Sequence, residues 1–291
     1  MALSLGSVEF PLRFLRYDPR IYQITVLSSL LVYGIGWLDF EISVVNASII
    51  LISVLLTQYI CTYVFRLPKY DPRSSLISGL SLCLLLRTNS LTLVIVTAFI
   101  TIASKFILRS REKHIFNPTN FGLVAMMLLT DQVWVSPGQW GSTAFLGFFI
   151  TCLGGLVVNR ASRSDVTCAF LVFYIAFLFG RALWLGDPLS IPLHQIQSGA
   201  FLIFTFFMIS DPKTTPDSRA GRILFAFLVA AGAFIVHFAF YRTNGLLWSL
   251  AFFSLFTPSI DLLLPGNRYE WKTIKTNPIF EEQVIIQPQR H

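Results

Sequence analysis

Long apolar stretches separated by short polar turns make up most of the chain. Their approximate ranges are 21–38, 44–64, 74–86, 90–108, 119–133, 142–158, 166–184, 198–210, 223–241 and 246–264. About 20 consecutive apolar residues suffice for a helix to cross a bilayer, whereas helices of soluble proteins keep one polar face. The pattern therefore predicts an all-α integral membrane protein with about ten transmembrane helices.

Composition excludes the other broad classes of protein. Of the 291 residues, 54% are hydrophobic and only 13% are charged, whereas soluble domains carry roughly 25% charged residues. The net charge of +7 comes from basic residues in the turns between apolar stretches, which is a sign of membrane topology and not of nucleic-acid binding. The four cysteines are far apart in apolar stretches, so we expect neither a metal site nor a disulfide framework.

The uneven distribution of basic residues predicts the orientation. With the N-terminus in the cytoplasm and ten alternating spans, 18 of the 22 Lys and Arg residues face the cytoplasm, and only Arg87, Arg181 and Arg242 face the other side. This bias follows the positive-inside rule. We therefore expect a multi-pass protein of the inner (plasma) membrane with both termini cytoplasmic. Its parts are an N-terminal segment at 1–20, a transmembrane domain at 21–264 and a flexible tail at 265–291.

Two of the ten stretches are too short to span a bilayer as straight helices. The third (74–86) and the eighth (198–210) have 13 residues each, which reach roughly 20 Å against a hydrocarbon core of about 30 Å. They contain the Ser-Gly pairs Ser78-Gly79 and Ser198-Gly199, and a Thr-Asn element with a glycine follows each pair about 40 to 45 residues later. An odd number of spans per half gives an inverted 5+5 repeat, with repeats at 21–133 and 142–264. Short or broken spans 3 and 8 then point to a binding site, and chance similarity of small polar residues is the alternative.

Polar hinges next to the short spans are the strongest candidates for a site. In Asn117-Pro118 and Asp211-Pro212 an Asn or Asp side chain can cap a helix that proline helps to start, leaving backbone donors free for a ligand. Such donors suit a polar, electron-rich ring or a phosphate, and helix capping alone is the alternative. The candidate ligand-binding residues are Asn117, Asn120, Gly122, Ser78, Gly79, Ser198, Gly199 and Asp211. No catalytic side chain is expected, Lys105 is expected to extend to the cytoplasmic surface, and Asp261 fits either an ion path or an interhelical hydrogen bond.

Three stretches resemble one known family. The run Lys105-Phe106 to Phe116-Asn117-Pro118 and Gly122 is similar to the Lys…Phe-Asn-Pro…Gly region of the NqrB/RnfD family of membrane electron-transport subunits. The runs from His194 through Phe206-Phe207-Met208-Ile209-Ser210-Asp211-Pro212 to Gly221-Arg222, and Phe256-Thr257-Pro258-Ser259-Ile260-Asp261, resemble its later signatures. The resemblance covers about residues 74–264. The wording of Leu86-Arg87-Thr88-Asn89 and Ser136-Pro137-Gly138-Gln139-Trp140 is most similar to the UnbU-type variant, which is associated with enediyne biosynthesis.

This resemblance implies a membrane subunit that takes part in transmembrane electron transfer or coupled ion transport. The chain would then be at most a non-autonomous part of an oxidoreductase, with other membrane subunits and the lipid bilayer as partners and a non-covalent flavin (riboflavin or FMN) near Asn117. Ion-pumping members carry a Ser/Thr-Gly-Ala-Thr motif whose Thr takes FMN covalently. The loop Asp131 to Gly141 lacks that motif, so covalent FMN is not expected. A small-molecule transporter or exporter of the same fold without a redox cofactor, and a structural membrane scaffold, stay open as alternatives.

Overall fold

The protein is helical throughout most of the part that the computed structural model describes, which is residues 19–37, 43–110, 113–136, 145, 147–149, 152 and 164–268. The helices of the first half are α1 (Pro19–Gly36), α2 (Val44–Val64), α3 (Arg73–Leu85), α4 (Leu91–Ile107) and α5 (Pro118–Leu129). Those of the second half are α7 (Ser164–Leu185), α8 (Ser190–Ile196), α9 (Gly199–Ile203), the π-helix η2 (Phe204–Met208), α10 (Arg219–Phe238), α11 (Gly245–Ser254) and α12 (Thr257–Leu263). This architecture agrees with an all-α membrane protein. The expected segment 142–158 lies mostly outside the described residues.

Small polar residues set where several helices begin. Ser90, Ser198 and Ser218 each accept a hydrogen bond from a backbone N–H three residues later, at the starts of α4, α9 and α10. Asn117 does the same for α5, in which Pro118 is the first helical residue. These side chains satisfy backbone donors that the first helical turn leaves unpaired, a matter of particular weight where no water is available.

The third and eighth apolar stretches form short helices, as expected. α3 has 13 residues, and α9 continues into the π-helical turn η2 to give an apolar helix over Gly199–Met208. A π-helical turn widens the helix locally and is often found at functional positions. The feature on which the binding-site prediction rests is therefore present in both halves.

Three helices are long and apolar enough to cross a membrane by themselves, namely α2, α7 and α10. The pair α11 and α12 passes the same test together, bent by 52° at the break between them, and would make a fourth span. Helices α3, α4 and α5 and the Gly199–Met208 helix are apolar but shorter than 18 residues. The count of ten spans stays a prediction.

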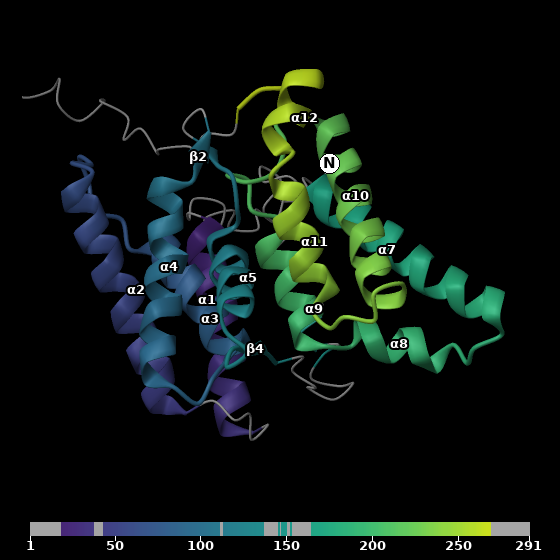
Figure 1. Cartoon of the computed structure of the whole chain (residues 1–291), viewed down its shortest axis with the longest axis horizontal. Coiled ribbons are helices and arrows are strands. Elements are labelled where there is room, and N and C mark those ends of the chain that lie inside the picture. Colours follow the sequence, from purple (N-terminus) through teal and green to yellow (C-terminus); the bar gives the residue numbers. More distant parts are fainter. Residues whose placement is uncertain are drawn as a thin grey trace, which may run out of the picture.

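The two halves of the chain lie side by side and have similar internal packing (Figure 1). In the first half α2 packs on α4 and α4 on α5, and in the second half α7 packs on α10 and α10 on α11. The halves meet where α5 contacts α11. Small residues permit close approach, since a Cβ added to Gly122 of α5 would collide with Thr101 of α4, and one added to Gly232 of α10 would lie 2.5 Å from Ser249 Oγ of α11.

Corresponding helices of the two halves run in opposite directions. The strand β2 (Arg109–Ser110) that follows α4 pairs with β3 (Lys113–His114) that precedes α5. Lys113 in turn forms ion pairs with Asp217, just before α10, and with Asp261 of α12. One end of the molecule therefore holds the end of α4 and the beginning of α10. Figure 1 shows this end at the top, with β2 and α12.

Two short antiparallel strand pairs were not part of the all-α prediction. The pair of β2 with β3 lies at the Lys113 end of the molecule, and at the opposite end β1 (Leu86–Arg87) pairs with β4 (Trp134–Val135). Each strand has two residues, too few for a hydrophobic alternation that could reveal them in the sequence. Both pairs join loops at the ends of α3, α4 and α5, so they fix the relative positions of these helices.

Candidate functional site

The start of α5 meets the end of η2 in a buried contact between the two halves. Asn117 is 6% exposed, and its Nδ2 lies 3.5 Å from Asp211 Oδ2 and 3.5 Å from the Met208 carbonyl oxygen. Both distances are at the long limit for a hydrogen bond. The Asn117 Oδ1 accepts from the Asn120 backbone N–H at 3.1 Å. The structure therefore brings together the two polar hinges that the sequence singled out.

Asn120 is the most unusual residue at this junction. Its side chain is fully buried, and neither its Oδ1 nor its Nδ2 has a hydrogen-bond partner among the described residues. Burying an amide without partners costs about 1–3 kcal/mol by mutational data. The hydroxyls of Thr101 and Thr205, on α4 and η2, are buried without a partner in the same described part of the chain. An amide left in this state is a candidate contact for a ligand.

The first Ser-Gly pair lies at this junction. Thr119, next to Asn120, donates from Oγ1 to the Ser78 carbonyl oxygen at 3.4 Å, which connects α5 to α3. A Cβ on Gly79 would lie 2.7 Å from Val54, so this glycine permits close packing of α3 on α2. Gly122 has the corresponding role between α5 and α4. Ser78 is thus close to the junction, whereas Gly79 and Gly122 serve helix packing.

The second Ser-Gly pair lies elsewhere. Ser198 caps α9 by accepting from the Phe201 N–H at 3.1 Å, and Gly199 is the first residue of that helix. Asp211 follows the other end of the same helix, roughly 15 Å away by the rise of ten helical residues. The structure therefore places Ser198 and Gly199 far from Asn117 along the helix axis.

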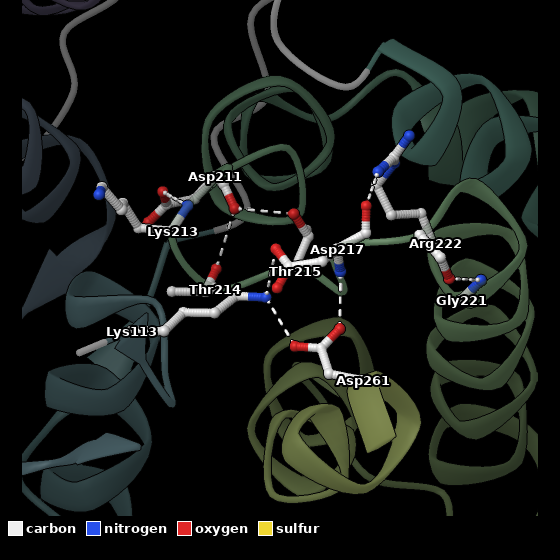
Figure 2. Close-up of polar contacts among 10 residues, drawn as sticks. Lys113, Asp211, Lys213, Thr214, Thr215, Asp217, Gly221, Arg222 and Asp261 are labelled. Carbon is white, nitrogen blue, oxygen red and sulfur yellow. Dashed lines mark hydrogen bonds and ion pairs between the residues drawn. The ribbon is translucent and has the colours of Figure 1, made fainter. Parts of the chain in front are cut away.

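A charged cluster next to the junction was missed by sequence reasoning. Figure 2 shows Lys113 Nζ bonded to Asp217 Oδ1 at 3.1 Å and to Asp261 Oδ2 at 2.8 Å, and Asp261 Oδ1 also accepts from the Asp217 N–H at 2.6 Å. These side chains are 11–16% exposed. Of the two alternatives for Asp261, the structure has the interhelical hydrogen bond. Lys113 and Asp217 are 104 residues apart, so no local pattern could have paired them.

The same cluster borders a cavity of about 260 Å³. The cavity is also lined by His114 and Thr257, each of which has a buried polar atom without a partner in the described part of the chain. Burial, with the cations Lys105, Arg109 and Lys213 nearby, lowers the pKa of His114 to about 3. His114 is therefore a neutral imidazole at physiological pH.

Lys105 does not extend to the surface, contrary to expectation. It is 6% exposed, and its Nζ donates to Gln58 Oε1 of α2 at 2.9 Å. The carboxylates of Asp211 and Asp71 are close enough to attract its ammonium group. A buried lysine needs such partners, and Gln58 supplies a neutral acceptor where the solvated surface was predicted. Lys105 thus adds positive charge to the interior near Asp211.

No group of three or more His, Cys, Asp or Glu side chains that could hold a metal occurs within the described ranges. The four cysteines are free, and three of them are buried. Cys83 donates weakly from Sγ to the Ala47 carbonyl oxygen at 3.7 Å. The polar chemistry of the interior is therefore that of amides, hydroxyls and the charged groups described above.

Residues 129–270 match the model of the NQR2, RnfD, RnfE family. Three similar proteins are each named as RnfD-type components of an ion-translocating oxidoreductase complex. The one from Alcanivorax borkumensis is 30% identical over 139 residues, which are 46% of this chain and 38% of the relative. The one from Erwinia tasmaniensis is 28% identical over 156 residues, covering 52% and 39%. The one from Pseudomonas paraeruginosa is 30% identical over 129 residues, covering 43% and 35%.

The chain spans about two fifths of the length of the curated relatives it matches. Of the candidate site residues, Ser198, Gly199 and Asp211 lie inside the matched segment, and Asn117 and Asn120 lie before it. The family match and the apolar helices indicate an integral membrane protein. The matched segment and the similar proteins together support the NQR2, RnfD, RnfE family as the family of this chain.

Proposed function

We propose that the chain is a membrane subunit of an ion-translocating electron-transport complex, of the RnfD/NqrB kind and closest to its UnbU-type variant. The observation that carries the proposal is the buried junction of Asn117 and Asp211, beside an Asn120 amide without a partner in the described structure. The names of the similar proteins support it. Other membrane subunits of such a complex are the proposed partners.

The proposed architecture is ten spans in an inverted 5+5 repeat. The equivalent packing of α2, α4 and α5 with α7, α10 and α11 supports it, as do the opposite directions of α4 and α10. Short apolar helices at the third and eighth positions are also typical of such repeats. The proposed repeats are 21–133 and 142–264, in the inner membrane with both termini cytoplasmic.

A non-covalent flavin is the cofactor proposed for the junction. The Asn120 amide offers one acceptor and an N–H donor group, and the imide edge of a flavin ring offers the complementary N–H and carbonyl groups. Two buried amide atoms without partners in the described structure fit that requirement. Because Asn120 is 0% exposed, a ring reaches it only when the packing at the start of α5 opens. A bound flavin supplies electron-transfer chemistry, while the chain supplies position and electrostatics.

Of this chain's residues, Asn117 and Asn120 would orient the ring by hydrogen bonds. Lys105, which Asp211 attracts, would place positive charge in the same region. We propose that no covalent FMN is attached, because the Ser/Thr-Gly-Ala-Thr motif is missing from the sequence.

Purification in mild detergent, with its membrane partners where they co-purify, tests the proposal. We expect flavin absorbance in the native protein, release of free flavin on denaturation and no fluorescent band on a denaturing gel. A fluorescent band would contradict the non-covalent assignment. A native protein without flavin in the presence of its partners would favour the second candidate, a transporter of the same fold without a redox cofactor, which the missing motif also suits.

A further inference from the structure

An open groove lies between α7 and α10, far from the Asn117 junction. Its volume is about 480 Å³, within the roughly 300–1,000 Å³ typical of ligand pockets. Its walls are almost wholly apolar except for one cation, Arg181. The aromatic side chains Phe177, Phe234 and Phe238 form much of the lining. No function described above uses this groove.

The groove faces the bilayer side of two proposed spans. α7 and α10 are both long and apolar enough to cross a membrane. They lie parallel, because Arg222 near the start of α10 pairs with Asp165 near the start of α7, while Arg181 and Phe238 meet near their other ends. Trp184 and Ile235, which line the groove, are 89% and 48% exposed. Exposed apolar surface of this kind on a spanning helix is covered by acyl chains and not by water.

Arg181 gives the groove a polar end. Its side chain is 34% exposed, its Nη1 donates to Asp187 at 3.1 Å, and its guanidinium lies 4.3 Å from the centre of the Phe238 ring. A guanidinium has five N–H donors, so the others stay available for a second anion. Trp184 is in the next helical turn, at the depth where Trp and Arg sit in the headgroup region.

Gly180 opens the middle of the groove. A Cβ built on it meets no atom within 4 Å, so this glycine does not permit close helix packing as Gly122 and Gly232 do. Instead it leaves space in the groove wall beside Arg181.

We propose that this groove binds an anionic phospholipid, with an acyl chain along Phe177 and Phe234 and the phosphate on Arg181. Charge and shape together select this occupant. The apolar walls suit a hydrocarbon chain, and the planar guanidinium fork matches a phosphate by two parallel N–H···O bonds. Because the phosphate competes with Asp187 for Arg181, Asp187 limits the affinity.

Lipid binding to the full-length protein in detergent tests this site. The probes are phosphatidylglycerol and phosphatidylcholine with the same acyl chains, and the readouts are bound lipid by native mass spectrometry and lipid-induced thermal stabilisation. Gly180→Leu should fill the groove and lower binding of both lipids at least tenfold, while the melting temperature of the lipid-free protein stays near that of the wild type. Gly36→Leu is the matched control, because a Cβ at Gly36 of α1 also meets nothing within 4 Å.

Two further variants separate the headgroup from the chain. Arg181→Gln should remove the preference for phosphatidylglycerol, a loss of about tenfold or more, since hydrogen bonds to a charged group are strong. Asp187→Asn should strengthen phosphatidylglycerol binding by freeing Arg181. The proposal is overturned if Gly180→Leu binds lipid as the wild type does, or if Arg181→Gln keeps the same lipid preference. None of these readouts involves flavin, so they are independent of the proposed redox function.

Discussion

Asn120 offers the sharpest test at the residue scale, because its side chain makes no hydrogen bond in the described structure. Asn120→Leu replaces the amide by an apolar group with the same number of heavy atoms. It removes the cost of the unpaired buried amide, so we expect the ligand-free protein to gain about 1–3 kcal/mol of stability. The same variant should lose its flavin. The measurements are thermal unfolding of flavin-free protein in detergent and the flavin retained by the native protein.

Asn117→Ala is the companion variant, and its stability should change in the opposite direction. Asn117 caps α5, so its loss should cost about 0.5–2 kcal/mol of stability. Flavin retention should also weaken, by about 5- to 150-fold if a loss of 1–3 kcal/mol appears in binding. If Asn120→Leu lowers the stability of flavin-free protein and leaves flavin bound, the assignment of this amide to a ligand is wrong.

His114 should make the protein sensitive to acid. Burial and the cations Lys105, Arg109 and Lys213 lower its pKa from 6.5 to about 3. Between those values the unfolded chain binds a proton that the folded protein does not, so stability falls as the pH drops from about 6.5 toward 3. The slope is at most about 1.4 kcal/mol per pH unit.

His114→Gln should flatten this pH dependence. The measurement is the melting temperature of wild type and variant between pH 7 and pH 4, with His194→Gln at an exposed position of α8 as the control for losing an imidazole. An unchanged slope in His114→Gln would show that His114 takes up its proton in the folded protein as readily as in the unfolded chain.

Close helix packing through glycine can be tested at the element scale. A Cβ on Gly122 would lie 3.2 Å from the Thr101 Cα and would collide with the Thr101 side chain. Gly122→Ala should therefore push α5 away from α4 and cost about 1–3 kcal/mol of stability. Gly36→Ala, which meets no atom within 4 Å, should stay within about 1 kcal/mol of the wild type. Equal melting temperatures for the two variants would mean that α4 and α5 can separate freely at this point.

The sequence predicts helices better than it predicts their contacts. The stretch 44–64 coincides with α2, because an uninterrupted apolar run has no internal signal to end the helix. The stretch 246–264 instead breaks after Ser254, and a new helix starts at Thr257 with Pro258 in its first turn. The stretch 198–210 becomes α9 and η2, and no residue in it marks the change to a π-helical turn.

The candidate site was predictable only in part, for the same reason. Asn117 and Asp211 were found because capping residues next to proline leave a local signal. That they meet, and that Lys113 joins Asp217 and Asp261, depends on packing between segments about 90 to 150 residues apart. The burial of Lys105 was missed because its acceptor, Gln58, lies on another helix.

The link between the halves at Lys113 can be tested at the scale of the whole molecule. Lys113→Met leaves the carboxylates of Asp217 and Asp261 close together without their cation, so we expect a loss of about 1–3 kcal/mol of stability. Adding Asp261→Asn removes one of the two charges and keeps an oxygen for the Asp217 N–H. The double variant should therefore be more stable than Lys113→Met alone. Additive losses in thermal unfolding would mean that the three side chains are not coupled.

The orientation of the whole molecule is the last prediction. Eighteen of 22 basic residues lie on one side of a ten-span arrangement with both termini cytoplasmic, and this bias orients membrane proteins as they insert. A reporter active only outside the cytoplasm should be silent when fused after Arg290 or inserted at Lys69, and active when inserted at Thr243. Insertion at Thr243 tests the outer turn between α10 and α11. An active fusion at Arg290 would require an odd number of spans and would refute the proposed ten-span arrangement.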